Sequence, residues 1–61
     1  MSVHYIKVRE IGSPTWSFLG RMGTYRLKMH ASRFDTIEKA QAVIDENTAD
    51  NPGWEWKVTS A

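Results

Sequence analysis

The chain has 61 residues, of which 25% are charged and 11% aromatic, and it contains no cysteine. This length has room for one domain, expected over residues 1–61, and buries only roughly 60% of the surface of the unfolded chain. Without cysteine, disulfides are excluded and a metal site is disfavoured, so association with another chain is the expected aid to stability. No apolar run approaches the roughly 18 residues of a membrane span, and the first residues lack the order of a signal peptide, so we expect a cytoplasmic protein.

The formal net charge of +1 hides an uneven distribution of charge along the chain. Residues 1–34 include six basic residues and one acidic residue, whereas residues 35–61 include two basic and six acidic residues. Such asymmetry can mark a surface that attracts a charged partner. In a small domain it can also be ordinary surface charge that aids solubility.

The first half of the chain has the alternating pattern of β-strands. A first strand is predicted from VHYIKVREI at residues 3–11, which ends at GSP, where Gly12 and Pro14 favour a turn. A second strand is predicted from TWSFLG at about residues 15–20, and the glycines of GRMG then suit a hairpin. A third strand, antiparallel to the second, is predicted at about residues 24–31 from the alternation in YRLKMHASRF.

A helix is predicted after Phe34, where the period of the apolar residues changes. One apolar face is formed at helical spacing by Ile37, Ala40, Val43 and Ile44. The helix begins either with Asp35 as N-cap of a capping box or with Thr36 as N-cap. It should end between Asn47 and Asp50, because the proline that follows cannot continue a helix.

The last segment, WEWKVTS, alternates again and predicts a closing strand. The element order is therefore β-β-β-α-β. We predict an α+β fold in which a small antiparallel sheet of about four strands carries one helix on one face and leaves the other face open. Ile6 and Val8 should point toward the helix, with Trp54 and Trp56 beside them in the core.

The open face of this predicted sheet gathers basic side chains. It would display Tyr5, Lys7, Arg9, Arg26, Lys28, His30 and Lys57, with Glu55 as the single acid. Trp16 is the aromatic residue expected to stay exposed, because several aromatic side chains compete for the space beneath one helix. The basic face is either a solvated strand surface or a site for nucleic acid, a nucleotide or an acidic protein.

No motif in the chain points to catalysis, and we expect neither an enzyme nor a cofactor. GRMG lacks the length and the Lys-Ser/Thr ending of a phosphate-binding loop. His4 and His30 are expected on opposite faces, and no carboxylate stands at a convincing ligand spacing from them, so no metal site is predicted. Asp45 and Glu46 are adjacent on the helix and therefore diverge, unlike an acid-base pair.

The stretch HASRFDTIEKAQAVIDE, followed by NPGWEWKV, resembles short reading frames of bacteriophages and prophages. In that pattern a strand ending in an aromatic-x-Thr step leads to a helix and a closing Trp-rich strand. The resemblance covers about half of the chain. It implies a non-catalytic accessory factor, such as an inhibitor of a host defence system, and no particular target. We expect the protein to occupy a host factor or to sequester a nucleotide ligand through the basic sheet face and the neighbouring aromatic residues.

The stretch from Trp16 through YRLKMHASRFDTIEKA also resembles the arm-binding domains of phage integrases, in which a three-stranded sheet enters the DNA major groove. That resemblance implies DNA binding as the alternative function, with Arg26, Lys28 and His30 as contacts. The closing strand at residues 54–58 departs from the integrase pattern. For either function we expect a homodimer or higher oligomer, because the core is small and aromatic residues are in surplus.

Overall fold

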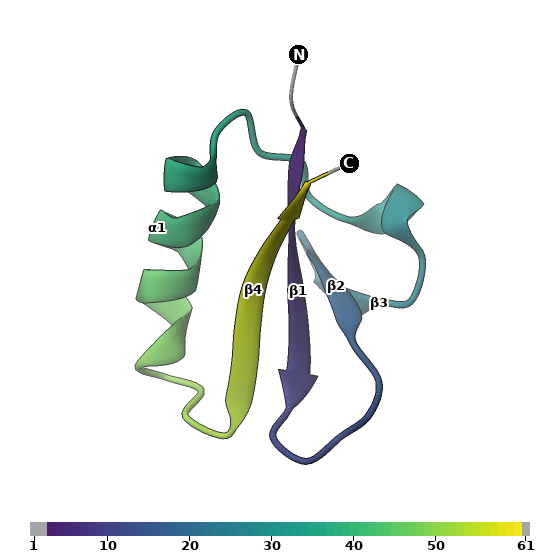
Figure 1. The fold of residues 1–61 in the computed structure, drawn as a ribbon, viewed down its shortest axis with the longest axis vertical. Helices are drawn as coiled ribbons and strands as arrows, with labels where there is room; N and C mark the ends of the chain where they lie inside the picture. The colour runs from purple at the N-terminus through teal and green to yellow at the C-terminus, as the bar shows by residue number, and fades with distance from the viewer. Residues whose placement is uncertain (1–2, 61) are drawn as a thin grey trace.

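The computed structural model of the protein describes residues 3–60. The elements are β1 (His4–Glu10), β2 (Ser17–Gly20), β3 (Gly23–Tyr25), a 3₁₀ turn η1 (Lys28–His30), α1 (Ile37–Thr48) and β4 (Trp54–Ser60). The strands form one antiparallel sheet in the order β3-β2-β1-β4, and α1 packs against one side of it (Figure 1). The predicted α+β architecture is confirmed.

β1 is a central strand and pairs with β4 along all seven of its residues. Ile6 lies opposite Val58, and Val8 lies opposite Trp56. Because side chains alternate between the faces of a sheet, these four residues share one face, and this face meets α1. The predicted orientation of Ile6 and Val8 is confirmed.

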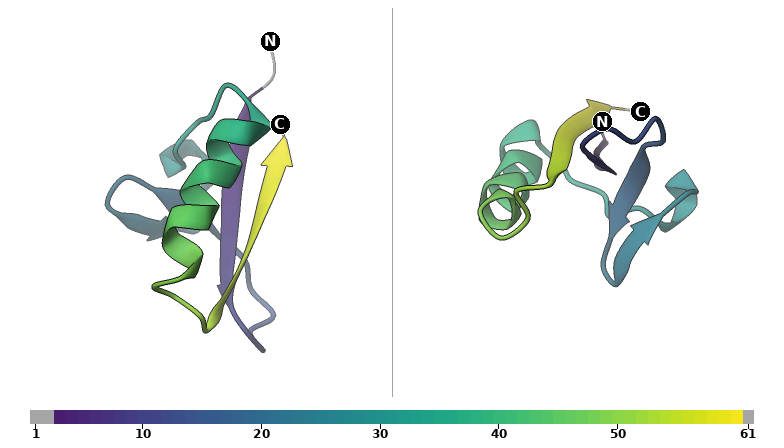
Figure 2. Two further views of the ribbon diagram at one scale, coloured as in Figure 1. Left: turned by 90° about the vertical axis from the view of Figure 1, so that its left-hand side faces the viewer. Right: turned by 90° about the horizontal axis from the view of Figure 1, so that it is seen from below.

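The core lies between α1 and the β1–β4 pair. Figure 2 shows that α1 runs alongside these two strands. The fully enclosed cluster consists of Ile6, Val8, Ala40 and Ile44, and around it pack the partly buried Leu19, Phe34, Val43, Trp54, Trp56 and Val58. Trp54 and Trp56 therefore belong to the core, as expected. Full burial of a side chain such as Ile6 or Val8 contributes about 1.5–3 kcal/mol relative to exposure.

Thr36 is the N-cap of α1. Its hydroxyl accepts a hydrogen bond of 3.1 Å from the backbone N–H of Lys39, and its own backbone is extended. This arrangement satisfies one of the free N–H groups of the first turn and decides between the two predicted starts in favour of Thr36. The helix ends at Thr48, inside the predicted interval.

The predicted third strand is wrong beyond Tyr25. β3 ends there, and the 3₁₀ turn η1 follows, with Leu27 and Met29 largely exposed at 57% and 74%. The chain bends because Tyr25 and the backbone of His30 pack closely over Gly20. A Cβ atom on Gly20 would lie 2.6 Å from Cδ2 of Tyr25 and 2.8 Å from the carbonyl oxygen of His30.

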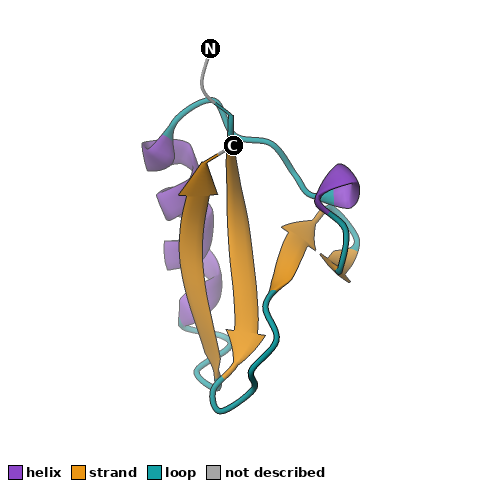
Figure 3. Ribbon diagram, turned by 45° about the vertical axis from the view of Figure 1, so that its right-hand side comes forward, coloured by secondary structure: helices purple, strands orange, loops and turns teal. Residues whose placement is uncertain are grey.

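After η1 the chain returns to the sheet in the space between β2 and β1. β2 pairs with β1 at only two positions and then diverges (Figure 3). The N–H of Ser32 donates to the carbonyl of Leu19 at 3.0 Å, and Phe34 exchanges two hydrogen bonds with His4, at 2.9 and 3.0 Å. Residues 32–34 thus fill the gap that opens between β2 and β1.

Candidate functional site

The outer face of the sheet is the side of β1 and β4 that points away from α1. Across these strands, Lys7 lies directly opposite Lys57, and Arg9 lies opposite Glu55. Tyr5 lies opposite a threonine on the same face. The predicted concentration of positive charge on β1 and β4 therefore occurs on this face.

Two aromatic rings lie against these cations. The Nζ atom of Lys7 is 5.4 Å from the ring centroid of Phe18. Trp16 is approached by two cations, with the Cζ atom of Arg9 at 4.5 Å and the Nζ atom of Lys57 at 4.3 Å from its ring. These distances are within the range of cation–π attraction. We define the basic-aromatic patch as Lys7, Arg9, Trp16, Phe18 and Lys57.

Arg9 positions the loop that carries Trp16. Its Nε and Nη2 atoms donate to Oε2 of Glu55 at 3.1 and 2.9 Å, and its Nη1 atom donates to the carbonyl of Ser13 at 3.4 Å. The guanidinium therefore joins β4 to the β1–β2 loop while its charge is balanced by Glu55. Within residues 3–60, Lys7 and Lys57 form no ion pair.

Tyr5 was expected to be displayed on the open face, and this is wrong: it is only 7% exposed. Phe18 packs edge-on against its ring with centroids 6.2 Å apart, and the Nζ atom of Lys28 lies 5.0 Å from the ring. Tyr5 is covered because Phe18 from the neighbouring strand and Lys28 from η1 lie over it. Lys28 thus reaches the outer face, but from the 3₁₀ turn and not from a strand.

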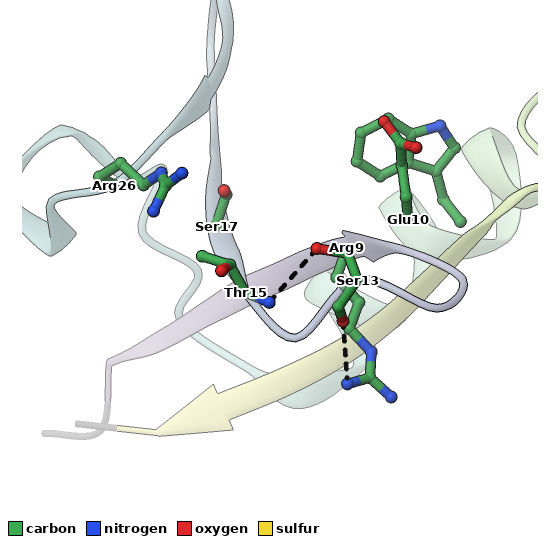
Figure 4. Close-up of a pocket in the computed structure, with 7 residues that line it drawn as sticks. Arg9, Glu10, Ser13, Thr15, Ser17 and Arg26 are labelled. Carbon is green, nitrogen blue, oxygen red and sulfur yellow. Dashed lines mark hydrogen bonds between the residues drawn. The ribbon is translucent and has the colours of Figure 1, made fainter.

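Arg26 and His30 do not join the basic-aromatic patch. The ring of His30 packs on Tyr25 at 5.4 Å. Arg26 lines a pocket of about 230 Å³ at the end of the sheet, which meets the patch only at Arg9 and is otherwise lined by Glu10, Ser13, Thr15, Ser17 and Trp54. Figure 4 shows Arg26 and Glu10 on opposite sides of this pocket. The expectation that both residues share the open face with Lys7 and Lys57 is wrong, because the strand meant to carry them ends at Tyr25.

Phe18 is part of the patch although it was not among the predicted site residues. Trp16 and Phe18 stand two residues apart, so the alternation predicts that they share a face but not which face. The pairing of Lys7 with Phe18 decides this. Glu55 was expected on the open face, and the register of β1 against β4 places it there, opposite Arg9.

The patch consists of three cationic side chains and two aromatic rings. Within the part of the chain that the structure describes, no three His, Cys, Asp or Glu residues gather where they could hold a metal ion. His4 is buried on the helix side of the sheet, with its Nδ1 atom 2.7 Å from the Oγ atom of Ser60, so it has a structural role there. No helix among residues 3–60 is long and apolar enough to cross a membrane.

Comparisons with known protein families, with curated proteins and with solved structures found no match to this chain. Its function is therefore inferred from the chemistry of the outer face.

Proposed function

We propose that this protein is a non-enzymatic binding protein that holds a nucleotide-type ligand, a planar ring system joined to phosphate, on its basic-aromatic patch. One observation supports this most strongly: Lys7 and Lys57 face each other directly beside two aromatic rings. Like charges placed opposite each other on neighbouring strands destabilise a sheet. A phosphate between the two ammonium groups replaces that repulsion with attraction.

The patch supplies both kinds of contact that a nucleotide needs. Lys7 and Lys57 bind phosphate oxygens, and Lys28 adds a third cation over the neighbouring Tyr5 ring. Trp16 is half-buried, and in this proposal the base stacks on its indole ring beside the two cations. Stacking of a base on an aromatic ring contributes about 1–3 kcal/mol without requiring a particular base.

The patch joins cations to aromatic rings, and this composition fits capture of a ligand. Joined to the resemblance to phage accessory proteins, this supports a protein that sequesters a nucleotide inside a host cell. The DNA-binding alternative requires Arg26, Lys28 and His30 to lie on one strand of a sheet that enters the major groove. Since these residues lie in a loop and a 3₁₀ turn, we favour a nucleotide or a single strand over duplex DNA.

The test is isothermal titration calorimetry with four ligands at two salt concentrations: a nucleoside triphosphate, a short single-stranded oligonucleotide, a duplex and inorganic phosphate. We expect the first two to bind most tightly, because only they offer phosphate and an accessible base together. Lys57→Gln should weaken their binding, whereas Lys39→Gln, on α1 beside Asp35, should not. Equal binding of all four ligands, or tightest binding of the duplex, would overturn the proposal.

A further inference from the structure

β4 is a long edge strand with a free edge. It has seven residues and pairs with β1, and no other strand among residues 3–60 borders it. In Figure 1 it is the strand nearest the viewer, and no other segment passes in front of it. It contains no proline, glycine or bulge of the kind that protects sheet edges from pairing.

A second copy could pair antiparallel with this edge in only a few registers. Side chains alternate, so the two helices stay on the same side of a continuous sheet only when residues of the same parity face each other. With Trp56 opposite the partner's Trp56, Glu55 faces the partner's Lys57, and by symmetry the same pair forms a second time. The two neighbouring registers place Lys57 opposite the partner's Lys57 or Glu55 opposite the partner's Glu55, which like-charge repulsion disfavours.

The same register also brings apolar side chains together on the face of β4 that meets α1. Trp54 then faces the partner's Val58, and the two Trp56 side chains lie beside each other. Trp54, Trp56 and Val58 are each only partly buried within one chain. Cross-strand aromatic and β-branched pairs stabilise sheets, so this register adds apolar contacts to a small core.

From the free edge and its charge complementarity, we propose that two copies pair through β4 about a two-fold axis at Trp56. The product is one continuous sheet containing the four strands of each copy. The outer faces of the copies then adjoin, so that each Glu55 touches both its own Arg9 and the partner's Lys57. Lys57 also belongs to the proposed ligand site, so the pairing is tested without ligand, and its failure is thereby distinguished from failure of the ligand proposal.

The first experiment measures mass by light scattering over a concentration series. The natural chain should have twice the mass of one copy at micromolar concentration. Glu55→Lys and Lys57→Glu should each raise the dissociation constant about tenfold or more, because each change replaces two attractive pairs with two repulsive ones. The double variant Glu55→Lys/Lys57→Glu should recover the dimer, whereas Lys39→Glu, far from the edge on α1, should leave it unchanged.

The second experiment uses the absence of cysteine from the chain. Residues that face each other across antiparallel strands have Cα atoms about 4.5–5.5 Å apart, which a disulfide can span. A mixture of Glu55→Cys and Lys57→Cys chains should therefore cross-link faster than either variant alone, whose cysteines lie two residues out of register. A monomeric mass throughout, failure of the double charge reversal to restore the dimer, or equal cross-linking in all three samples would overturn this inference.

Discussion

Lys7 and Lys57 lie opposite each other on β1 and β4, and each ammonium group lies over an aromatic ring. The next pair along the same face, Arg9 and Glu55, is oppositely charged and joined at 2.9 Å. The charges of Arg9 and Glu55 therefore neutralise each other, whereas those of the neighbouring Lys7 and Lys57 do not. The proposed ligand therefore binds at the lysine pair, which has no acidic partner among residues 3–60.

Removing one cation of this pair should change how binding depends on salt. Each phosphate that a lysine neutralises on a single strand contributes about 0.7 to the slope of log affinity against log salt. Lys7→Gln and Lys57→Gln should therefore each reduce the slope for an oligonucleotide by about that amount. Titrations at several salt concentrations measure it, and a slope equal to that of the natural chain would contradict a role for the substituted lysine.

Gly20→Ala should destabilise the fold. The new methyl group would collide with Tyr25 and with the backbone of His30, and overpacking of this kind costs about 1–3 kcal/mol. The free energy of unfolding from urea denaturation measures the effect. Gly53→Ala is the matched control, because a Cβ atom there meets nothing within 4 Å. If both variants unfold like the natural chain, the packing of Tyr25 over Gly20 is not as described.

The N-cap of α1 gives a second prediction of stability. Thr36→Ala removes the hydroxyl that accepts from Lys39 and should cost about 1 kcal/mol, whereas Thr36→Ser retains an acceptor and should cost less. Urea denaturation of the two variants separates the cap from the loss of a methyl group. Equal losses in both would show that the hydroxyl contributes nothing.

Arg9→Lys tests whether the guanidinium positions Trp16. Lysine keeps the charge but cannot hold Glu55 and the carbonyl of Ser13 at once. Because the pair is partly exposed, we expect a loss of stability of only about 0–1 kcal/mol, together with weaker ligand binding. Glu55→Gln is the comparison, since it weakens the ion pair and leaves the contact of Arg9 with Ser13. Unchanged binding in Arg9→Lys would assign Arg9 a purely structural role.

The sequence correctly predicted β1, β4 and α1, because their local pattern of apolar residues matches the way they pack. The alternation of β1 and β4 and the apolar face of α1 describe residues that meet in one core, and Thr36 was one of two predicted caps. These elements could be located because each apolar stripe has a partner to cover it. Local pattern and tertiary packing agree there.

The segment after Tyr25 could not be predicted in this way. Leu27 and Met29 alternate with polar residues as in a strand, but β2 is too short to pair with them. Their side chains therefore have no sheet or helix to pack against and stay exposed. The decisive feature is the contact of Tyr25 with Gly20, which depends on the tertiary fold. Arg26 and His30 belong to this segment, so two of the three misplaced site residues follow from this one misplaced strand. The third is the buried Tyr5.

The most direct test of the proposed function is a nuclear magnetic resonance titration of the ¹⁵N-labelled protein with a short single-stranded oligonucleotide. The account predicts that the indole N–H signal of Trp16 and the amide signals of Lys7, Phe18 and Lys57 move together, while those of Trp54, Trp56 and the exposed residues of α1 stay in place. Shifts centred on Arg26, Glu10 and Ser17, or no shifts at millimolar ligand, would contradict it.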